Sequence, residues 1–151
     1  MFNVVLIEPE IPPNTGNIAR LCLATGSRLH LVEPLGFSIN DRQLRRAGMD
    51  YWHLVDVQYW KSLTDFEAVT RAPIRRFLLT TKCTRTYWET KFRAGDYLVF
   101  GRETRGLPES LLLSNPENCL TIPMAPGARS LNLSTAVAVV LFEGIRQLHC
   151  E

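Results

Sequence analysis

Residues 2–34 read "FNVVLIEPEIPPNTGNIARLCLATGSRLHLVEP", and this stretch decides the class of fold. It begins with a short apolar run, rich in β-branched residues, that stops at Pro9 and is typical of a buried strand followed by a loop. A helical pattern follows, in which we expect Asn14 to cap the helix and Gly26 to end it. A second strand ends at Pro34. A strand, a helix and a strand joined by short loops favour a parallel sheet covered by helices.

The same alternation continues to the end of the chain. Further strands are expected at 51–57, 74–81, 96–101 and 119–124, and further helices at 40–48, 62–72, 107–113 and 132–148. The last helix is apolar almost all round but too short to span a bilayer. We expect it to be buried inside the domain or against a second copy of the chain, so a homodimer is a reasonable inference. The prediction is an α/β fold with a single domain over 1–151, built on a mostly parallel sheet flanked by helices.

Length and composition agree with this prediction. A chain of 151 residues suits one domain, and 46% hydrophobic and 21% charged residues favour neither disorder nor a fibrous repeat. The net charge of +2 is too small to indicate a nucleic-acid partner. Arginine is nevertheless clustered, and its guanidinium suits phosphate, although a solvated helix face is the simpler interpretation of each single cluster. The two clusters are Arg42, Arg45 and Arg46, and Arg71, Arg75 and Arg76.

Several classes of site are disfavoured by the residues. The four cysteines form no C-x-x-C pair, so no metal site is expected. The N-terminus has neither the basic region nor the cleavage site of a secretory signal, which favours a cytoplasmic protein with reduced thiols. The common phosphate-binding glycine motifs and the nucleophile elbow are absent. The three histidines suit packed or solvated roles better than catalysis.

Three motifs remain, each at the end of an expected strand: "NTGNIAR" (14–20), "FGRETRGLP" (100–108) and "IPMAPGARSLNLS" (122–134). In this order and spacing they resemble the motifs of SPOUT-superfamily RNA 2'-O-ribose methyltransferases. The resemblance is closest to the small tRNA (cytidine/uridine-2'-O)-methyltransferases of the wobble position, of the TrmL or YibK type. It extends over essentially the whole chain. Arg102 stands where a proline is common in the family and Cys83 where a glycine is common, so we expect the contacts with tRNA to differ in detail from those of relatives.

The resemblance implies a C-terminal deep trefoil knot that binds S-adenosylmethionine in its bent loops and releases S-adenosylhomocysteine, without a metal. It also implies a tRNA substrate recognised through its anticodon stem-loop, with leucine tRNAs expected. The active site is implied to be built from both subunits of a homodimer, with no membrane involved. The cofactor-binding residues implied by the motifs are Leu79, Thr80, Gly101, Glu103, Gly106, Ile122, Pro123, Met124, Ser130, Leu131 and Leu133.

The first-motif arginine, Arg20, is the implied catalytic residue at the reacting ribose, as a general base or as a phosphate clamp. A guanidinium is almost always protonated at neutral pH, which favours the clamp. We expect Asn14, Asn17, Ser130 or Asn132 to order the hydroxyl, with Asn132 also capping the last helix. Glu103 is expected to order its loop while paired with its arginine neighbours. Implied RNA-binding residues are Arg20, Arg42, Arg45, Arg46, Lys82 and Arg129, with Arg85 as a further candidate; Tyr51, Trp52, Tyr87 and Trp88 suit base stacking or core packing.

Three other functions stay open. A SPOUT enzyme of another kind acts on rRNA or on another tRNA position. A non-catalytic RNA-binding member of the fold binds tRNA without methyl transfer. Another nucleotide-binding α/β protein shows no salt-sensitive RNA binding.

Overall fold

The computed structural model describes residues 1–39, 49–71 and 73–149, and six strands within them form one parallel sheet in the order β3-β2-β1-β5-β4-β6. The strands are β1 (Asn3–Ile7), β2 (Arg28–Val32), β3 (Val57–Trp60), β4 (Arg76–Leu79), β5 (Tyr97–Phe100) and β6 (Cys119–Leu120). The helices are α1 (Pro12–Thr25), α3 (Leu63–Val69), α4 (Glu109–Ser114) and α5 (Leu133–His149), with short 3-10 helices η1 (Met49–Leu54), η2 (Tyr87–Glu89) and η3 (Pro116–Asn118). The predicted α/β class and parallel sheet are confirmed.

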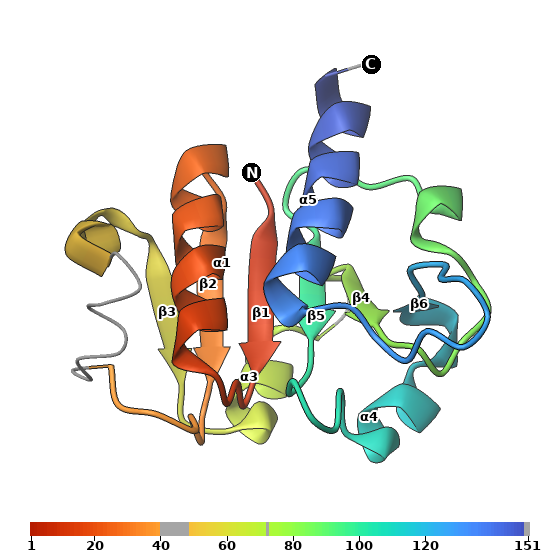
Figure 1. Cartoon of the computed structure of the whole chain (residues 1–151), viewed down its shortest axis with the longest axis horizontal. Coiled ribbons are helices and arrows are strands. Elements are labelled where there is room, and N and C mark those ends of the chain that lie inside the picture. The colour runs from red at the N-terminus through yellow and green to blue at the C-terminus, as the bar shows by residue number, and fades with distance from the viewer. Residues whose placement is uncertain (40–48, 72, 150–151) are drawn as a thin grey trace.

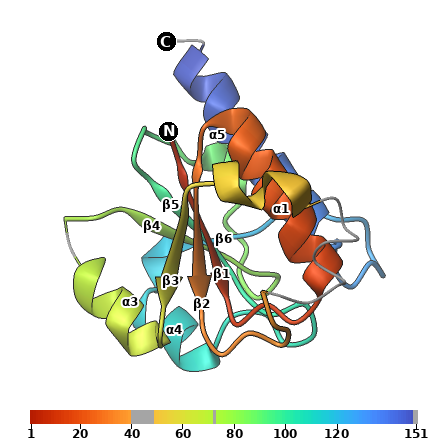
Figure 2. The same ribbon diagram turned by 90° about the vertical axis from the view of Figure 1, so that its left-hand side faces the viewer.

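Helices cover both faces of this sheet. Helices α1 and α5 lie side by side on one face, and α3 and α4 lie on the other (Figures 1 and 2). Because side chains alternate along a strand, Val4 and Leu6 of β1 join the core beneath α1 and α5, whereas Val5 and Ile7 join the core beneath α3 and α4. None of the helices in the described part of the chain is long and apolar enough to cross a membrane.

Some expected elements were placed wrongly. The strand expected at 51–57 begins only at Val57, because residues 57–60 are the ones that pair with β2. The preceding segment forms η1, in which Tyr51 and Trp52 pack against the core and the Tyr51 hydroxyl donates to the Gly16 carbonyl at 3.2 Å. The strand expected at 119–124 shrinks to Cys119–Leu120 with one further bridge, and the rest enters a loop. The helix expected at 40–48 lies outside the described residues.

Helix α1 also begins earlier than expected. Its first residue is Pro12, its N-cap Ile11 supplies no side-chain hydrogen bond, and Asn14 lies inside the helix rather than capping it. Proline suits this position because the first amides of a helix lack intrahelical partners in any case. Asn14 is therefore free for another role.

The loops that follow the strands meet at one edge of the sheet. Since all strand pairs are parallel, the carboxyl ends of β1, β4, β5 and β6 point the same way, toward the lower edge in Figure 1. In such sheets ligands bind outside the carboxyl ends of the strands. Helix α5 starts at the same edge and runs back across the sheet (Figure 1).

Candidate functional site

A cavity of about 650 Å³ lies at this edge, surrounded by the start of α1 and by the loops that follow β4, β5 and β6. Its volume is in the range of small-molecule sites. The expected site residues that line it are Asn14, Leu79, Thr80, Lys82, Gly101, Glu103, Gly106, Ile122, Met124, Arg129, Ser130, Leu131, Asn132 and Leu133. Of the expected cofactor-binding residues, Pro123 alone does not line it, although both of its neighbours do. The structure thus brings residues from three distant motifs into one cavity.

Sequence reasoning missed other parts of the wall. The apolar ones are Ile11, Phe100, Leu107 and Ala136, and the polar ones are Thr81, Arg102, Thr104 and Arg105. Most of them lie within the three motifs or next to one, so proximity to a motif was the available signal. Ile11 lies three residues before the first motif and contributes because α1 begins early.

The loop after β5 depends on two glycines. The Arg102 and Gly106 backbones hydrogen-bond to each other, with Arg102 N donating at 3.1 Å and Gly106 N at 2.9 Å. A Cβ on Gly101 would lie 2.0 Å from the Gly106 carbonyl carbon, which no side-chain movement can relieve. Gly106 has a φ of +68°, in the left-handed region that favours glycine. Close approach of backbone to backbone therefore forms this wall of the cavity.

Glu103 ties that loop to the start of α1. Its carboxylate accepts hydrogen bonds from Glu10 N at 2.8 Å, Ile11 N at 3.0 Å and Asn14 Nδ2 at 3.3 Å. Two of these donors are the backbone amides of the N-cap Ile11 and of the residue before it, directly ahead of a helix whose first two residues are prolines without N–H groups. Glu103 thus stabilises the start of α1 from a loop more than 90 residues away in the sequence.

The expected pairing of Glu103 with its arginine neighbours was wrong. Within the described residues neither Arg102 nor Arg105 forms an ion pair with it, and Arg102 pairs instead with Glu8. Glu10, close to Glu8, accepts hydrogen bonds from Thr104 N at 3.3 Å and from Thr104 Oγ1 at 2.9 and 3.0 Å. Glu103 thus binds the backbone amides before α1, whereas its neighbours Arg102 and Thr104 bind the carboxylates of Glu8 and Glu10 in the loop after β1.

Two asparagines continue the chain of contacts. Asn14 is only 5% exposed, and its Oδ1 accepts a hydrogen bond from Asn132 Nδ2 at 3.0 Å. Asn132 Oδ1 in turn accepts from Ser134 N at 2.9 Å and from Ser134 Oγ at 2.6 Å. Asn132 therefore caps α5 and lines the cavity at once, as expected. Glu103, Asn14 and Asn132 link the three motifs through side chains.

Arg20 lies apart from the cavity in this chain. It is exposed on α1, with its Cζ 5.7 Å from the centre of the Tyr51 ring, and it does not line the cavity. Burial raises the pKa of that tyrosine, whereas the guanidinium charge acts to lower it. Six residues separate Arg20 from Asn14, a rise of about 9 Å along a helix. One chain alone does not place Arg20 beside the other expected site residues.

The remaining expected RNA-binding residues have different surroundings. Lys82 and Arg129 are exposed at the cavity, and Arg102 and Arg105 add positive charge there. Arg42, Arg45 and Arg46 lie outside the described residues. Among the aromatic candidates, Tyr51, Trp52 and Tyr87 pack against the core, and Trp88 is 58% exposed. Across the described ranges, no group of three or more His, Cys, Asp or Glu residues is placed to hold a metal ion.

The walls of the cavity fit the implied cofactor. Leu79, Ile122 and Leu131 offer apolar surface to a flat base, and the glycine loop exposes backbone groups to the polar edge of one. Glu103, Ser130 and Asn132 supply acceptors and donors for hydroxyl and amino groups. The cavity therefore offers both the apolar walls and the hydrogen-bonding groups that a nucleoside requires.

Comparisons with known proteins agree with this geometry. The model of the SpoU rRNA Methylase family matches residues 1–142. A protein of Escherichia coli strain K12 named tRNA (cytidine(34)-2'-O)-methyltransferase is 53% identical over 151 residues, covering 98% of this chain and 94% of that protein. A structure described as giving insights into the 2-OH methylation of C/U34 on tRNA has a TM-score of 0.94 at 44% identity, covering 100% of this chain and 98% of that one. An AdoMet-bound rRNA methyltransferase from Sinorhizobium meliloti has a TM-score of 0.85 at 27% identity, covering 97% of this chain and 56% of that one.

Proposed function

The chain belongs to the SpoU rRNA Methylase family, and we propose that it methylates the ribose 2'-hydroxyl of the wobble nucleotide, position 34, of tRNA. S-adenosylmethionine supplies, when bound, a methyl group on a positively charged sulfur. The names of the Escherichia coli relative and of the similar structure support the wobble position, and the AdoMet-bound relative supports the cofactor. A tRNA substrate in turn favours a cytoplasmic location.

One observation carries the proposal. The three motifs meet in one cavity and are joined there by the hydrogen bonds that Asn14 donates to Glu103 and that Asn132 donates to Asn14. Leu79, Ile122 and Leu131, with the backbone of the glycine loop, are the residues that would hold the cofactor. Side-chain amides beside such a pocket suit the ordering of a hydroxyl, a task that Asn14, Asn132 and Ser130 share in this proposal.

Arg20 acts in this proposal on the RNA rather than as a base. A guanidinium remains protonated at neutral pH and offers a planar fork of donors that matches a phosphate. It would hold a phosphate of the substrate and stabilise negative charge that develops at the ribose oxygen. Since Arg20 does not line the cavity of its own chain, it acts at the cavity of a second subunit.

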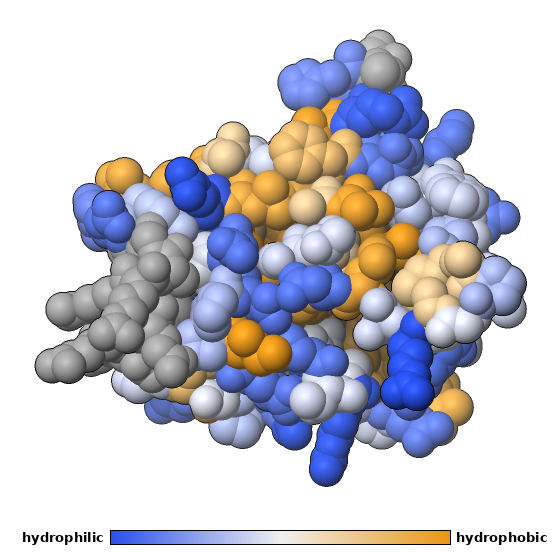
Figure 3. All heavy atoms as spheres, viewed as in Figure 1, coloured by the Kyte–Doolittle hydropathy of each residue, from blue (hydrophilic) through white to orange (hydrophobic). Residues whose placement is uncertain are grey.

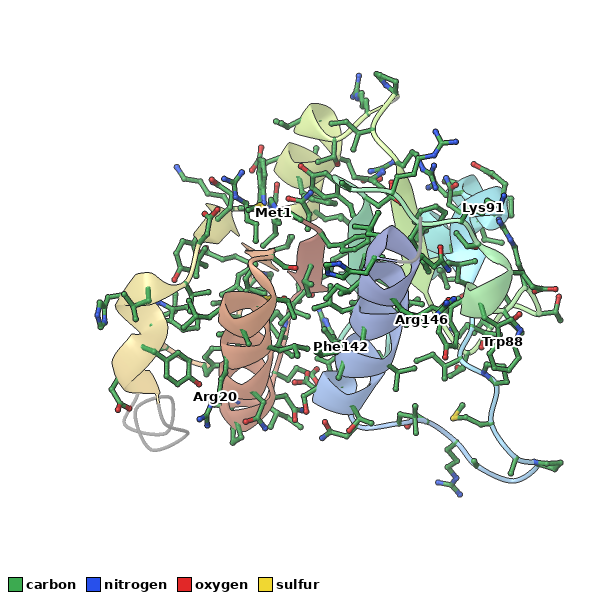
Figure 4. The ribbon with its side chains drawn as sticks, turned by 90° about the horizontal axis from the view of Figure 1, so that it is seen from above. Met1, Arg20, Trp88, Lys91, Phe142 and Arg146 are labelled. Atoms are coloured by element: carbon green, nitrogen blue, oxygen red, sulfur yellow. The ribbon has the colours of Figure 1, made fainter. Side chains whose placement is uncertain are left out.

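An apolar surface supports that second subunit. Apolar side chains gather over the neighbouring helices α1 and α5, where Phe142 is 54% exposed and Leu23 is 36% exposed (Figure 3). Val139, three residues before Phe142 on α5, is only partly buried. A large apolar patch of this kind on a monomer marks an interaction site. We infer that a second copy of the chain covers this surface and that the homodimer is the active species. Arg20 lies on α1, beside the surface that the second copy would cover (Figure 4).

The implied C-terminal trefoil knot is also part of the proposal. After β6 the chain runs beside the segment that follows β4, with Thr121 N donating to Arg85 O at 2.8 Å and Tyr87 N donating to Thr121 O at 3.0 Å. The next loop then returns to the start of α5, beside α1 (Figure 1). This course suits a chain end threaded through the loops around the cavity.

Methyl transfer to unmodified bulk tRNA tests the function. The protein is incubated with labelled S-adenosylmethionine and tRNA, and labelled riboses are mapped by nuclease digestion and mass spectrometry. We expect 2'-O-methylcytidine or a 2'-O-methylated uridine at position 34, with leucine tRNAs as the main substrates. Label at another tRNA position or in rRNA supports a SPOUT enzyme of other specificity, and binding without label supports a non-catalytic member of the fold.

Variants of Arg20 test its role. Arg20→Ala is expected to lose nearly all turnover, and Arg20→Lys to retain part of it if a point charge suffices. Arg71→Ala is a matched control, because Arg71 is exposed and does not line the cavity. Near-normal turnover by Arg20→Ala contradicts both the clamp and the general base.

A further inference from the structure

A second hollow lies at the other end of β4. The first cavity is lined by Leu79 and Thr80, where β4 ends, and the second by Arg75, Arg76 and Phe77, where β4 begins. The second hollow is a shallow cleft of about 430 Å³. Three residue steps of a strand separate Arg76 from Leu79, which is about 10 Å. The two sites therefore lie on opposite edges of the same sheet.

The cleft is strongly basic. Five of its lining side chains are cationic, namely Arg75, Arg76, Arg85, Lys91 and Arg93, and none of those that the structure describes in its wall is acidic. Arg75 pairs with Asp96 at 3.1 Å and Arg76 with Glu67 at 3.9 Å. Within the described part of the chain, the side chains of Arg85, Lys91 and Arg93 form no ion pair, although the Arg93 backbone amide donates to Asp96 Oδ2 at 2.7 Å. A chain with a net charge of only +2 thus concentrates unpaired positive charge here.

Backbone carbonyls hold two of these arginines in place. Arg75 Nη2 donates to the Lys91 carbonyl at 2.7 Å, and Arg85 Nη1 donates to the Glu117 carbonyl at 2.9 Å. Arg75 is further fixed with its Cζ 5.2 Å from the centre of the Phe77 ring. Each guanidinium keeps other N–H groups for a ligand, and a side chain already held in place loses less entropy on binding. The guanidinium groups of the cleft are therefore preorganised to bind an anion.

An exposed aromatic side chain lies close by. Trp88 is two residues before Thr90, which lines the cleft, and three before Lys91. Seen from the edge at which the strands begin, Trp88 and Lys91 both lie on the side of α5 away from Arg20 (Figure 4). Basic side chains beside an exposed aromatic ring are typical of surfaces that bind nucleic acid, because a base stacks on the ring while its phosphates meet the cations.

We propose that this cleft binds the sugar-phosphate backbone of the substrate tRNA, at nucleotides outside those held in the first cavity. The inference rests on the proposed function for its choice of RNA. A strand carries one phosphate per nucleotide, so an RNA that occupies one edge of the sheet has many phosphates with which to reach the other. Such contacts position the RNA without reading its sequence.

The expected effect follows from counterion release. Each phosphate contact changes the slope of log affinity against log salt by about 0.9, which is worth roughly 5-fold in affinity at about 0.15 M salt. Lys91 and Arg93 are exposed and form no ion pair within the described residues, so their replacement leaves the fold intact. The double variant Lys91→Gln, Arg93→Gln is expected to weaken tRNA binding about 30-fold and to flatten the slope by about 1.8.

Anisotropy of fluorescently labelled, unmodified tRNA measures both quantities between about 0.05 and 0.3 M salt. Lys61→Gln, Arg71→Gln is the matched control, since it removes the same charge from exposed residues that line neither cavity. The variant Lys91→Arg, Arg93→Lys keeps the charge and is expected to bind like the wild type. In methylation assays we expect the glutamine variant to raise KM for tRNA and to leave kcat unchanged.

The outcomes separate the cleft from the proposed function. If the glutamine variant binds tRNA with the affinity and the salt dependence of the wild type, the proposal that the cleft binds tRNA is wrong, whether or not the protein methylates tRNA. Titration with inorganic phosphate tests for a small-anion site. If the glutamine variant loses phosphate binding but keeps its affinity for tRNA, the cleft binds a small anion and the proposal is equally wrong. Lost tRNA affinity in a protein that methylates no tRNA supports the cleft and refutes the proposed function.

Discussion

Replacing Glu103 with glutamine tests the link between the cofactor loop and α1. The carboxylate accepts hydrogen bonds from three donors, the amides of Glu10 and Ile11 and the side chain of Asn14. A glutamine of the same shape has one acceptor oxygen, and its NH₂ group would face an N–H group instead. The change therefore removes the negative charge and leaves at least one donor at the start of α1 without a partner.

The loss is about 2 kcal/mol of unfolding free energy. A hydrogen bond to a charged group contributes about 1.5 to 3 kcal/mol, and the partial exposure of Glu103 places the loss toward the lower end. Negative charge at a helix start adds less than about 1 kcal/mol more at such a site. If the loosened loop must be ordered again when the cofactor binds, up to about 30-fold of affinity is lost as well.

Urea unfolding followed by tryptophan fluorescence and calorimetric titration with S-adenosylhomocysteine measure the two losses. Glu117→Gln is the matched control, because the Glu117 carboxylate is exposed and accepts only from Asn118 Nδ2 at 3.2 Å among the described residues. We expect that control to unfold within about 0.5 kcal/mol of the wild type. A Glu103→Gln protein that unfolds at the wild-type urea concentration and binds the product with unchanged Kd would refute the role of these hydrogen bonds.

Three further changes probe other parts of the molecule. Gly101→Ala is expected to abolish S-adenosylhomocysteine binding in calorimetry, because its Cβ would lie 2.0 Å from the Gly106 carbonyl carbon; unchanged affinity contradicts the close approach. Burial, aided by Arg28, lowers the pKa of His30 from 6.5 to about 4, so the unfolded chain takes up the proton first as pH falls. Urea titrations should therefore show full stability above about pH 6.5 and a loss of up to roughly 3 kcal/mol by about pH 4, and a His30→Gln variant without a flatter profile counts against this. Phe142→Glu is expected to yield monomers in sedimentation and to abolish turnover, whereas an active monomer excludes the shared site.

The sheet was predictable because its signals are local. The apolar run of β1 and the turn residues that follow it lie in one short stretch, and Gly26 ends α1 in the left-handed conformation expected of a terminating glycine. The α5 prediction succeeded for the same reason, since an uninterrupted helical pattern is long enough to exclude a strand. The prediction failed at 51–57, where an aromatic-rich segment has the same composition whether it pairs with β2 or packs as η1.

The composition of the site came from the family motifs, but its internal bonding did not. Nothing local in the sequence indicates that Glu103 would turn from its arginine neighbours to amides at the start of α1, because the two segments are separated by most of the chain. Nor does the sequence show that Arg20 lies near the Tyr51 ring and does not line the cavity of its own chain. Both facts depend on how distant elements meet, which tertiary packing decides.

The weak start of α1 explains why the site behaves as one unit. The N-cap Ile11 has no side chain that could cap the helix, and Glu103 of the distant loop instead accepts from Ile11 N and Glu10 N, the two amides directly before it. Asn14, now inside the helix, binds both Glu103 and Asn132, and Asn132 caps α5. The starts of both helices on this face of the sheet therefore depend on residues that also line the cavity. A ligand that orders the glycine loop would thus order α1 and α5 as well, and those are the helices whose outer surface we assign to the second subunit.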